Sequence, residues 1–213
     1  MLSDVRNTSP AAATPATPAR TPRPAKDEVR ARVLRAAGQV FAERGFSAAS
    51  LDQVAAAAGF TKGAVYSNFD SKDELFLALM ADTVSRRVDA VETALQGTTD
   101  LPGALAAVGA ELSSREATWH LLFLEYWQRA VRDPGVRAGF VGFRRELRTR
   151  ITEVVERFLA EHPVRTGWDA GSLTVVLIAL THGLAVEALP DPAAVPDDLL
   201  THVLADLIDP EQA

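Results

Sequence analysis

The sequence predicts an all-α protein of about nine helices, and three observations lead to this fold class. Apolar residues recur at intervals of three and four positions along most of the chain, as on one face of an α-helix. No segment alternates apolar and polar residues in the manner of a strand. Capping residues, glycines and prolines divide the periodic segments into lengths typical of helices. With 213 residues, of which 47% are apolar, the chain can bury a sizeable core.

The first 25 residues are predicted to form a disordered tail. Pro, Ala, Thr and Ser dominate residues 1–25, and large apolar residues are too few for this segment to fold alone. Three basic residues, Arg20, Arg23 and Lys26, lie near its end. The tail is either a flexible terminus without further role or a basic arm that contacts nucleic acid, as homeodomain arms do.

A first helix is predicted over residues 26–44. Val33, Ala37 and Phe41 repeat at four-residue spacing and belong to its apolar stripe. Gly45 is suited to end the helix. Two short helices follow, and they need this third helix because they cannot close a core by themselves.

Residues 50–69 predict two short helices joined by a tight turn. Ser50 can cap the first helix, and Gln53 three positions later can complete a capping box. Gly59 tolerates the positive φ of a helix end. Thr61 can cap the second helix.

The second of these helices is expected to present a small, polar and cationic outer face. Val65 and Phe69 are four residues apart and are expected to face inward. Such an outer face fits the DNA major groove, which admits one α-helix. We therefore predict a helix-turn-helix motif. Its outward-facing residues are Lys62, Gly63, Tyr66 and Ser67.

The remainder of the chain continues as helices separated by Gly, Pro and capping residues. The first of them is long enough to leave the small N-terminal bundle and enter a second one. The predicted helices span 71–96, 102–114, 118–132, the segment from the break at 133–135 to residue 161, 169–189 and 197–208. The predicted organisation is a tail (1–25), a helix-turn-helix domain (26–72) and a helical domain for effector binding and dimerisation (73–213).

The last two helices are too apolar for the surface of a monomer. Residues 173–189 are apolar nearly all round, and Ala179 and Gly183 would let a partner backbone come close. Paired across a two-fold axis, the two helices would form a four-helix dimer interface. The alternative is an ordinary buried core helix. The predicted interface residues are Val176, Leu180, Gly183, Leu184, Leu200, Val203, Leu204 and Leu207.

Composition and charge limit the classes of function. The absence of cysteine excludes disulfides and thiolate sites. No apolar run reaches the ~18 residues of a membrane span, and no signal peptide is evident, so we expect a cytoplasmic protein without a membrane partner. The net charge is −6, but residues 1–72 carry 10 basic and 6 acidic side chains, whereas residues 73–213 carry 12 and 22. A basic N-terminal part would orient the molecule on a polyanion.

The motifs of common enzymes are absent from the sequence. There is no Gly-x-Ser-x-Gly, His-Glu-x-x-His, Walker loop or Gly-x-Gly-x-x-Gly. The four histidines are not spaced like a metal site on one helix. We therefore expect neither a metal nor a cofactor, and no enzyme.

Four segments of the N-terminal part resemble the tetracycline-repressor (TetR) family of bacterial regulators. They are Phe41–Phe46, Ser50–Ala55, Ala58–Tyr66 and Phe69–Leu75. The resemblance is strong over about a quarter of the chain and weaker in the helical remainder. It implies a homodimer in which the second helix of the motif enters the major groove. It also implies a ligand cavity in the C-terminal domain.

The resemblance assigns DNA contacts to individual residues. Ser50 and Thr61 would contact phosphate at helix starts, Lys62 would donate to guanine, and Lys72 would anchor phosphate. Asn68 stands where the family usually has His or Tyr, and it is shorter. Capping is an alternative role for the hydroxyl residues. The predicted DNA-binding residues are Ser50, Thr61, Lys62, Gly63, Tyr66, Ser67, Asn68 and Lys72.

Aromatic residues with a few polar neighbours are the candidates for the ligand site. The same residues would also fit an ordinary helical core. The candidates are Trp119, Phe123, Tyr126, Trp127, Phe140, Phe143, Arg144 and His182.

Together these features predict a DNA-binding transcriptional regulator, expected to be a repressor. It would bind a palindromic operator in double-stranded DNA as a homodimer and be released by a small organic ligand. The alternatives are a ligand-independent DNA-binding or structural protein, and a small-molecule enzyme on a helical scaffold.

Overall fold

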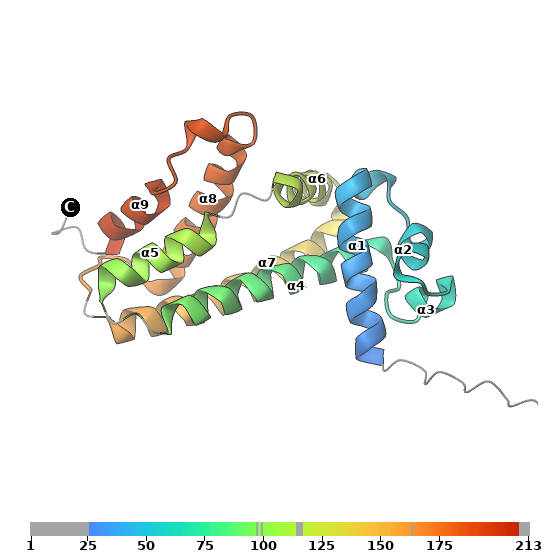
Figure 1. Ribbon diagram of the computed structural model, residues 1–213, viewed down its shortest axis with the longest axis horizontal. Coiled ribbons are helices and arrows are strands. Elements are labelled where there is room, and N and C mark those ends of the chain that lie inside the picture. The colour runs from blue at the N-terminus through green and yellow to red at the C-terminus, as the bar shows by residue number, and fades with distance from the viewer. Residues whose placement is uncertain (1–25, 97, 99, 114–116, 163, 209–213) are drawn as a thin grey trace, which may run out of the picture.

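The computed structural model describes residues 26–96, 98, 100–113, 117–162 and 164–208. These residues contain nine α-helices, one short 3₁₀ helix and no strand, which confirms the all-α prediction (Figure 1). The tail predicted over residues 1–25 lies outside the described residues. The elements are α1 (Lys26–Ala48), α2 (Leu51–Ala58), α3 (Lys62–Tyr66), α4 (Lys72–Leu95), α5 (Leu101–Leu112), α6 (Ala117–Arg132), α7 (Pro134–Glu161), α8 (Ala170–Ala188), η1 (Pro192–Ala194) and α9 (Leu199–Ile208).

Glycine and hydroxyl residues fix the helix ends of the N-terminal head, which consists of α1, α2 and α3. Gly45 has φ 74° and ψ 167°, so the regular part of α1 stops where the sequence predicts. Ser50 and Gln53 form the predicted capping box. Gly59 is left-handed, with φ 71° and ψ 29°. Thr61 caps α3 by accepting a hydrogen bond from the N–H of Ala64 (3.3 Å).

The head is held together by large apolar side chains from all of its helices. Phe41 from α1, Val54 from α2 and Val65 from α3 are fully buried, as is Phe69 just after α3. The ring of Phe46 packs against those of Phe41 and the α4 residue Phe76. Each such side chain contributes roughly 1.5–3 kcal/mol to folding, so the short helix α3 is stabilised by packing rather than by its own length.

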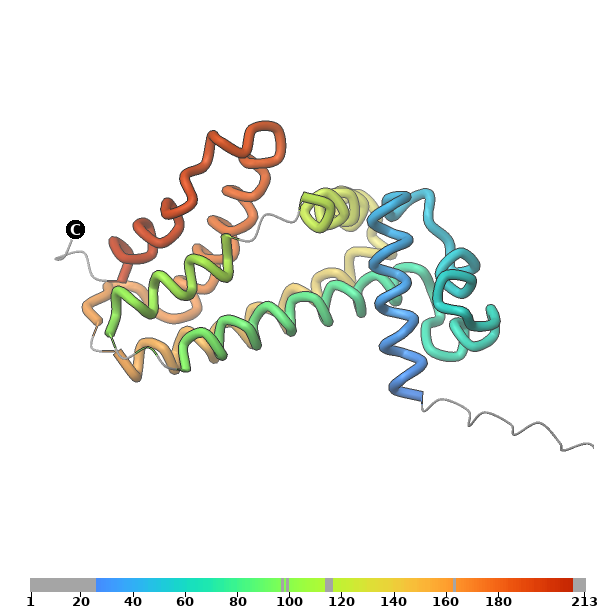
Figure 2. The backbone as a smooth tube through the Cα atoms, in the orientation of Figure 1, coloured from blue at the N-terminus to red at the C-terminus, as the bar shows by residue number. Residues whose placement is uncertain are grey.

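Two long helices connect the head to the rest of the molecule. Helices α4 and α7 lie side by side from the head toward the far end (Figure 2). At that end α5, α8 and α9 pack around a second core that contains Leu105, Phe158 and Leu200. Helix α6 lies between the two ends of the molecule and contacts α1, α7 and α8.

Part of the predicted dimer interface is wrong. Leu200 and Leu204 are 3% and 6% exposed and belong to the second core. Helix α9 packs on α5, so these two residues face into their own subunit. On α8, Leu180 and Leu184 are half-buried against the same core, whereas Gly183 is exposed.

Helix α8 departs from one further expectation. It is the one helix among the described residues that is long and apolar enough to cross a membrane by length and composition. The expectation from the sequence that no apolar segment is long enough to span a membrane was therefore wrong for α8. Helix α8 packs against α6, α7 and α9, but only 17% of this stretch is buried in the structure.

Candidate nucleic-acid interface and internal cavity

The predicted outer face of α3 is exposed in the structure. Tyr66 is 50% exposed and is one of the large hydrophobic side chains on the surface. A Cβ atom at Gly63 would meet nothing within 4 Å, so its backbone is open to a partner. Val65 on the opposite side is fully buried. The head therefore buries the apolar side of α3 and leaves the opposite side exposed to solvent, where a macromolecule such as DNA can reach it.

The ammonium of Lys62 forms an ion pair with the carboxylate of Asp52 on α2. The hydrogen bond and the charge of Asp52 raise the pKa of Lys62. Both side chains are largely exposed. The ion pair links the two helices of the motif, and it places a negative charge beside the cation predicted to contact base edges.

The remaining polar residues of the motif bond mainly to the motif itself. Ser67 Oγ donates to the carbonyl of Ala64 (2.9 Å), and Asn68 Nδ2 donates to the same carbonyl (2.8 Å). Ser50 and Thr61 act as helix caps. Their hydroxyl groups are exposed, so capping leaves their O–H donors available for phosphate.

Lys72 does not have the role that the sequence predicted. Its Nζ donates to three carbonyls, those of Phe46 (2.8 Å), Ser47 (3.1 Å) and Ala49 (2.9 Å). The ammonium group also lies over the Phe46 ring, and burial lowers the pKa of Lys72. Because an ammonium has three donors, none remains for a phosphate. Lys72 instead ties the last residues of α1, after Gly45, and the link to α2 to the start of α4.

A carboxylate from α6 completes this junction, and sequence reasoning missed it. Glu125 accepts hydrogen bonds from Phe46 N (2.8 Å), Ser47 N (2.8 Å) and Ser47 Oγ (2.5 Å). Burial acts to raise the pKa of Glu125, but these hydrogen bonds and the nearby Lys72 outweigh it and lower the pKa. Arg129, one turn later, pairs with Asp73 of α4. Charged groups of α6 thus hold this helix to α1 of the head and to the start of α4.

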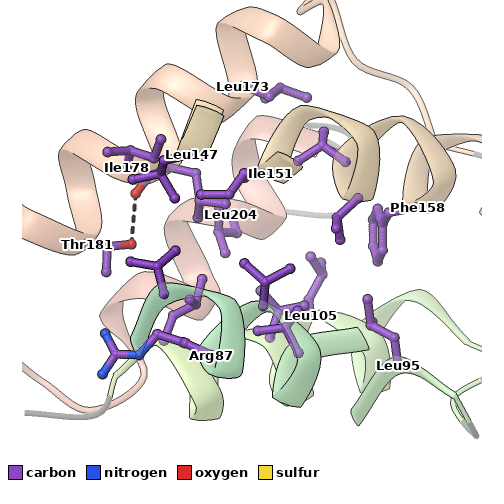
Figure 3. A pocket seen from close by; sticks show the side chains of 18 of the residues that line it. Arg87, Leu95, Leu105, Leu147, Ile151, Phe158, Leu173, Ile178, Thr181 and Leu204 are labelled. Carbon is purple, nitrogen blue, oxygen red and sulfur yellow. Dashed lines mark hydrogen bonds between the residues drawn. The ribbon is translucent and has the colours of Figure 1, made fainter. Parts of the chain in front are cut away.

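The part of the molecule formed by α4 to α9, which we call the body, contains a cavity of about 170 Å³ (Figure 3). Its wall is mostly Leu, Ile and Val from α4, α5, α7, α8 and α9. Trp119 and His120 at the start of α6 also line it. Helix α6 therefore reaches the cavity with its first residues and holds the head through Glu125, near its middle.

The predicted ligand residues are distributed over three places. Trp119 and His182 line the cavity. Phe123 and Trp127 line a surface groove between α6 and α8, and Arg144 lies over their rings. The other three, Tyr126, Phe140 and Phe143, are core residues that do not line the cavity, so the structure does not support their assignment to the ligand site. Tyr126, for example, packs against Phe46 and Phe76.

Comparisons with known proteins agree with this architecture. A family model described as bacterial regulatory proteins, tetR family, matches residues 33–79. A second, described as BetI-type transcriptional repressor, C-terminal, matches residues 101–212, which is more than half of the chain. The chain belongs to the TetR family of bacterial regulators. The TetR-family assignment makes it a helix-turn-helix transcriptional regulator that binds DNA.

Two curated relatives share part of this TetR chain. The transcriptional activator FasR of Mycolicibacterium smegmatis is 44% identical over 75 residues, or 35% of this chain and 34% of FasR. The transcriptional repressor BepR of Brucella suis is 42% identical over 53 residues, or 25% of each chain. The chain thus matches only a quarter to a third of these relatives' length, and the two have opposite effects on transcription.

Solved TetR-like structures share the fold. A TetR-family regulator from Rhodococcus sp. aligns with a TM-score of 0.70 and 18% identity, covering 86% of this chain and 100% of that one. FadR from Bacillus subtilis, in complex with stearoyl-CoA, aligns with a TM-score of 0.64 and 15% identity, covering 83% of this chain and 96% of FadR. A regulator from Saccharomonospora viridis, in complex with choline, aligns with a TM-score of 0.61 and 21% identity, covering 84% of this chain and 95% of that one.

Proposed function

We propose that this TetR-family protein is a cytoplasmic, ligand-responsive repressor that binds a palindromic operator as a homodimer. The observation that carries the proposal is the exposed face of α3, with Lys62, Gly63 and Tyr66 outward and Val65 buried. A rigid helix of this kind can enter a major groove. The match to the BetI-type repressor model favours repression over activation. The proposed domains are residues 26–72 for DNA and 73–213 for ligand and dimer.

The proposed dimer surface is the outer stripe of α8. Val175 is 54% exposed and Val186 is 37% exposed, and both are apolar. Ala179 and Gly183 lie between them on the exposed side. A Cβ atom at Gly183 would meet nothing within 4 Å, so a partner helix has room to approach. A second copy would cover this stripe by the symmetric pairing that is usual in homodimers.

The internal cavity favours a ligand-responsive protein over one that binds DNA alone. Proteins with this fold have been solved with stearoyl-CoA and with choline. Here the cavity touches α4 and the start of α6, and both helices join the head. A ligand that binds better to one spacing of the two heads would shift the population toward that spacing.

Selection of bound sequences from a random DNA pool at fixed salt tests this function. The expected result is a palindrome with two half-sites about one helical turn, or a multiple of it, apart. Operator binding should also weaken steeply with rising salt, because phosphate contacts release counterions. Enrichment of no sequence, or of a single half-site bound by a monomer, would contradict the proposal.

A further inference from the structure

The cavity has a polar end and an apolar end. Arg87 of α4 and Thr181 of α8 lie on one side, and Leu95 and Phe158 lie on the opposite side (Figure 3). Aliphatic side chains make up most of the wall between them. Because an unpaired polar group is costly against such a wall, the cavity suits a molecule with a polar group at one end and a hydrocarbon chain at the other.

The charged groups at the polar end are basic. Arg87 is half-buried, and no residue in the described part of the chain forms a hydrogen bond or an ion pair with it. No Asp or Glu is among the described residues that line the cavity. A cation bound here would add like charge to Arg87, whereas an anion would supply the missing partner.

Basic groups also surround the imidazole of His182, which lines the same cavity. Its Nδ1 lies 2.7 Å from the carbonyl oxygen of Ile178, one turn earlier on α8. Burial lowers the pKa of His182, and although this contact opposes the effect, Arg144, His120 and Arg87 lower it further. These three groups come from α7, α6 and α4, so basic groups approach the imidazole from three helices.

We propose that the cavity binds an aliphatic carboxylate, with its carboxylate on Arg87 and its chain extending toward Leu95 and Phe158. The inference rests on the proposed ligand-responsive function of the same cavity. A guanidinium can donate two parallel hydrogen bonds to a carboxylate. A cavity of ~150 Å³ in another protein holds benzene. A volume of about 170 Å³ therefore suits a chain of roughly six to ten carbon atoms.

Calorimetric titration of the 213-residue protein with three eight-carbon probes tests the inference. The probes are octanoate, 1-octanol and octyltrimethylammonium, which share the chain and differ in the charge of the head. Octanoate should bind about 10- to 100-fold more tightly than 1-octanol, which is the range expected for hydrogen bonds to a charged group. Octyltrimethylammonium should bind most weakly.

Arg87→Met and Arg86→Met form a matched pair of variants for this titration. Arg86 is the next residue on α4, but it is exposed and paired with Asp82. Arg87→Met should remove the preference for octanoate over 1-octanol and keep the affinity for 1-octanol, which also shows that the variant is folded. Arg86→Met should bind all three probes as the unmodified protein does.

Two results among bound probes would overturn the inference. One is equal or tighter binding of 1-octanol or octyltrimethylammonium, and the other is an unchanged octanoate affinity in Arg87→Met. Operator binding, measured on the same preparations, separates this outcome from failure of the proposed function. Release of operator by a different ligand, with no binding of octanoate, would reject the carboxylate and keep the regulator. Failure to bind any operator would reject the regulator.

Discussion

Replacing Glu125 by Gln should weaken the attachment of the head to the body. The carboxylate accepts three hydrogen bonds from Phe46 N, Ser47 N and Ser47 Oγ, all across the junction. A net hydrogen bond contributes about 0.5–1.5 kcal/mol. Glu125 is partly exposed, so solvent screening places each bond at the lower end of that range. Gln keeps one acceptor oxygen, so the two bonds from Ser47 can persist without charge assistance, but its NH2 group would face the N–H of Phe46 and leave that donor unsatisfied. An unsatisfied donor costs about 1–3 kcal/mol, so the expected loss in the free energy of unfolding is about 2 kcal/mol at pH 7.

Urea and thermal unfolding measure this loss. For a chain of this size, 2 kcal/mol corresponds to a fall in Tm of roughly 4–8 °C. Glu146→Gln, which changes an exposed carboxylate on α7, should leave Tm nearly unchanged. The folded-state pKa of Glu125 is lowered. Its contribution is therefore fully present above the unfolded pKa of about 4.3 and is lost as the pH falls through the folded pKa.

The effect of Glu125→Gln on the free energy of unfolding should therefore change with pH in a defined direction. The difference in unfolding free energy between the unmodified protein and Glu125→Gln should be largest at neutral pH and shrink as the solution is acidified. A difference that stays constant, or that grows toward low pH, would refute the reasoning. Equal Tm values for Glu125→Gln and Glu146→Gln would also refute it.

Three further changes have defined outcomes. Lys72→Met should lower the free energy of unfolding by about 2 kcal/mol, and the urea midpoint with it, because three carbonyls lose their donor. An unchanged midpoint would restore the phosphate-anchor role. Asp52→Asn should tighten operator binding several-fold in mobility-shift assays, because it removes a negative charge beside Lys62; weaker binding would show that the ion pair positions the lysine. Val175→Glu should convert the dimer to monomer in sedimentation, whereas Leu121→Glu, at an equally exposed apolar residue, should not; a dimeric Val175→Glu would reject the α8 stripe.

Local patterns were sufficient to predict the helices and the motif. Ser50, Gly59 and Thr61 act within three or four residues of their own positions, so their capping roles are visible in the sequence. The apolar spacing of Val65 and Phe69 likewise predicts which side of α3 is buried. These features depend only on neighbours along the chain, and the structure agrees with them.

Contacts between distant segments could not be predicted in this way. Glu125 meets Ser47 across 78 positions, and no local spacing indicates that approach. Lys72 follows the motif as a phosphate-binding lysine would, and only the position of the turn at 46–49 shows that its donors are used. Phe140 and Tyr126 were predicted to bind the ligand because they are aromatic, but they belong to the core. The cavity is lined mainly by aliphatic side chains, whose pattern in the sequence does not differ from that of an ordinary core.

The outer face of α3 as the DNA-reading surface is the central claim. Its most direct test is operator affinity, by fluorescence anisotropy, for the double variant Lys62→Ala with Tyr66→Ala. Both side chains are exposed, so the variant should keep its Tm and its dimer. We predict that it loses operator binding. An unchanged operator affinity in a folded, dimeric double variant would contradict the assignment of α3.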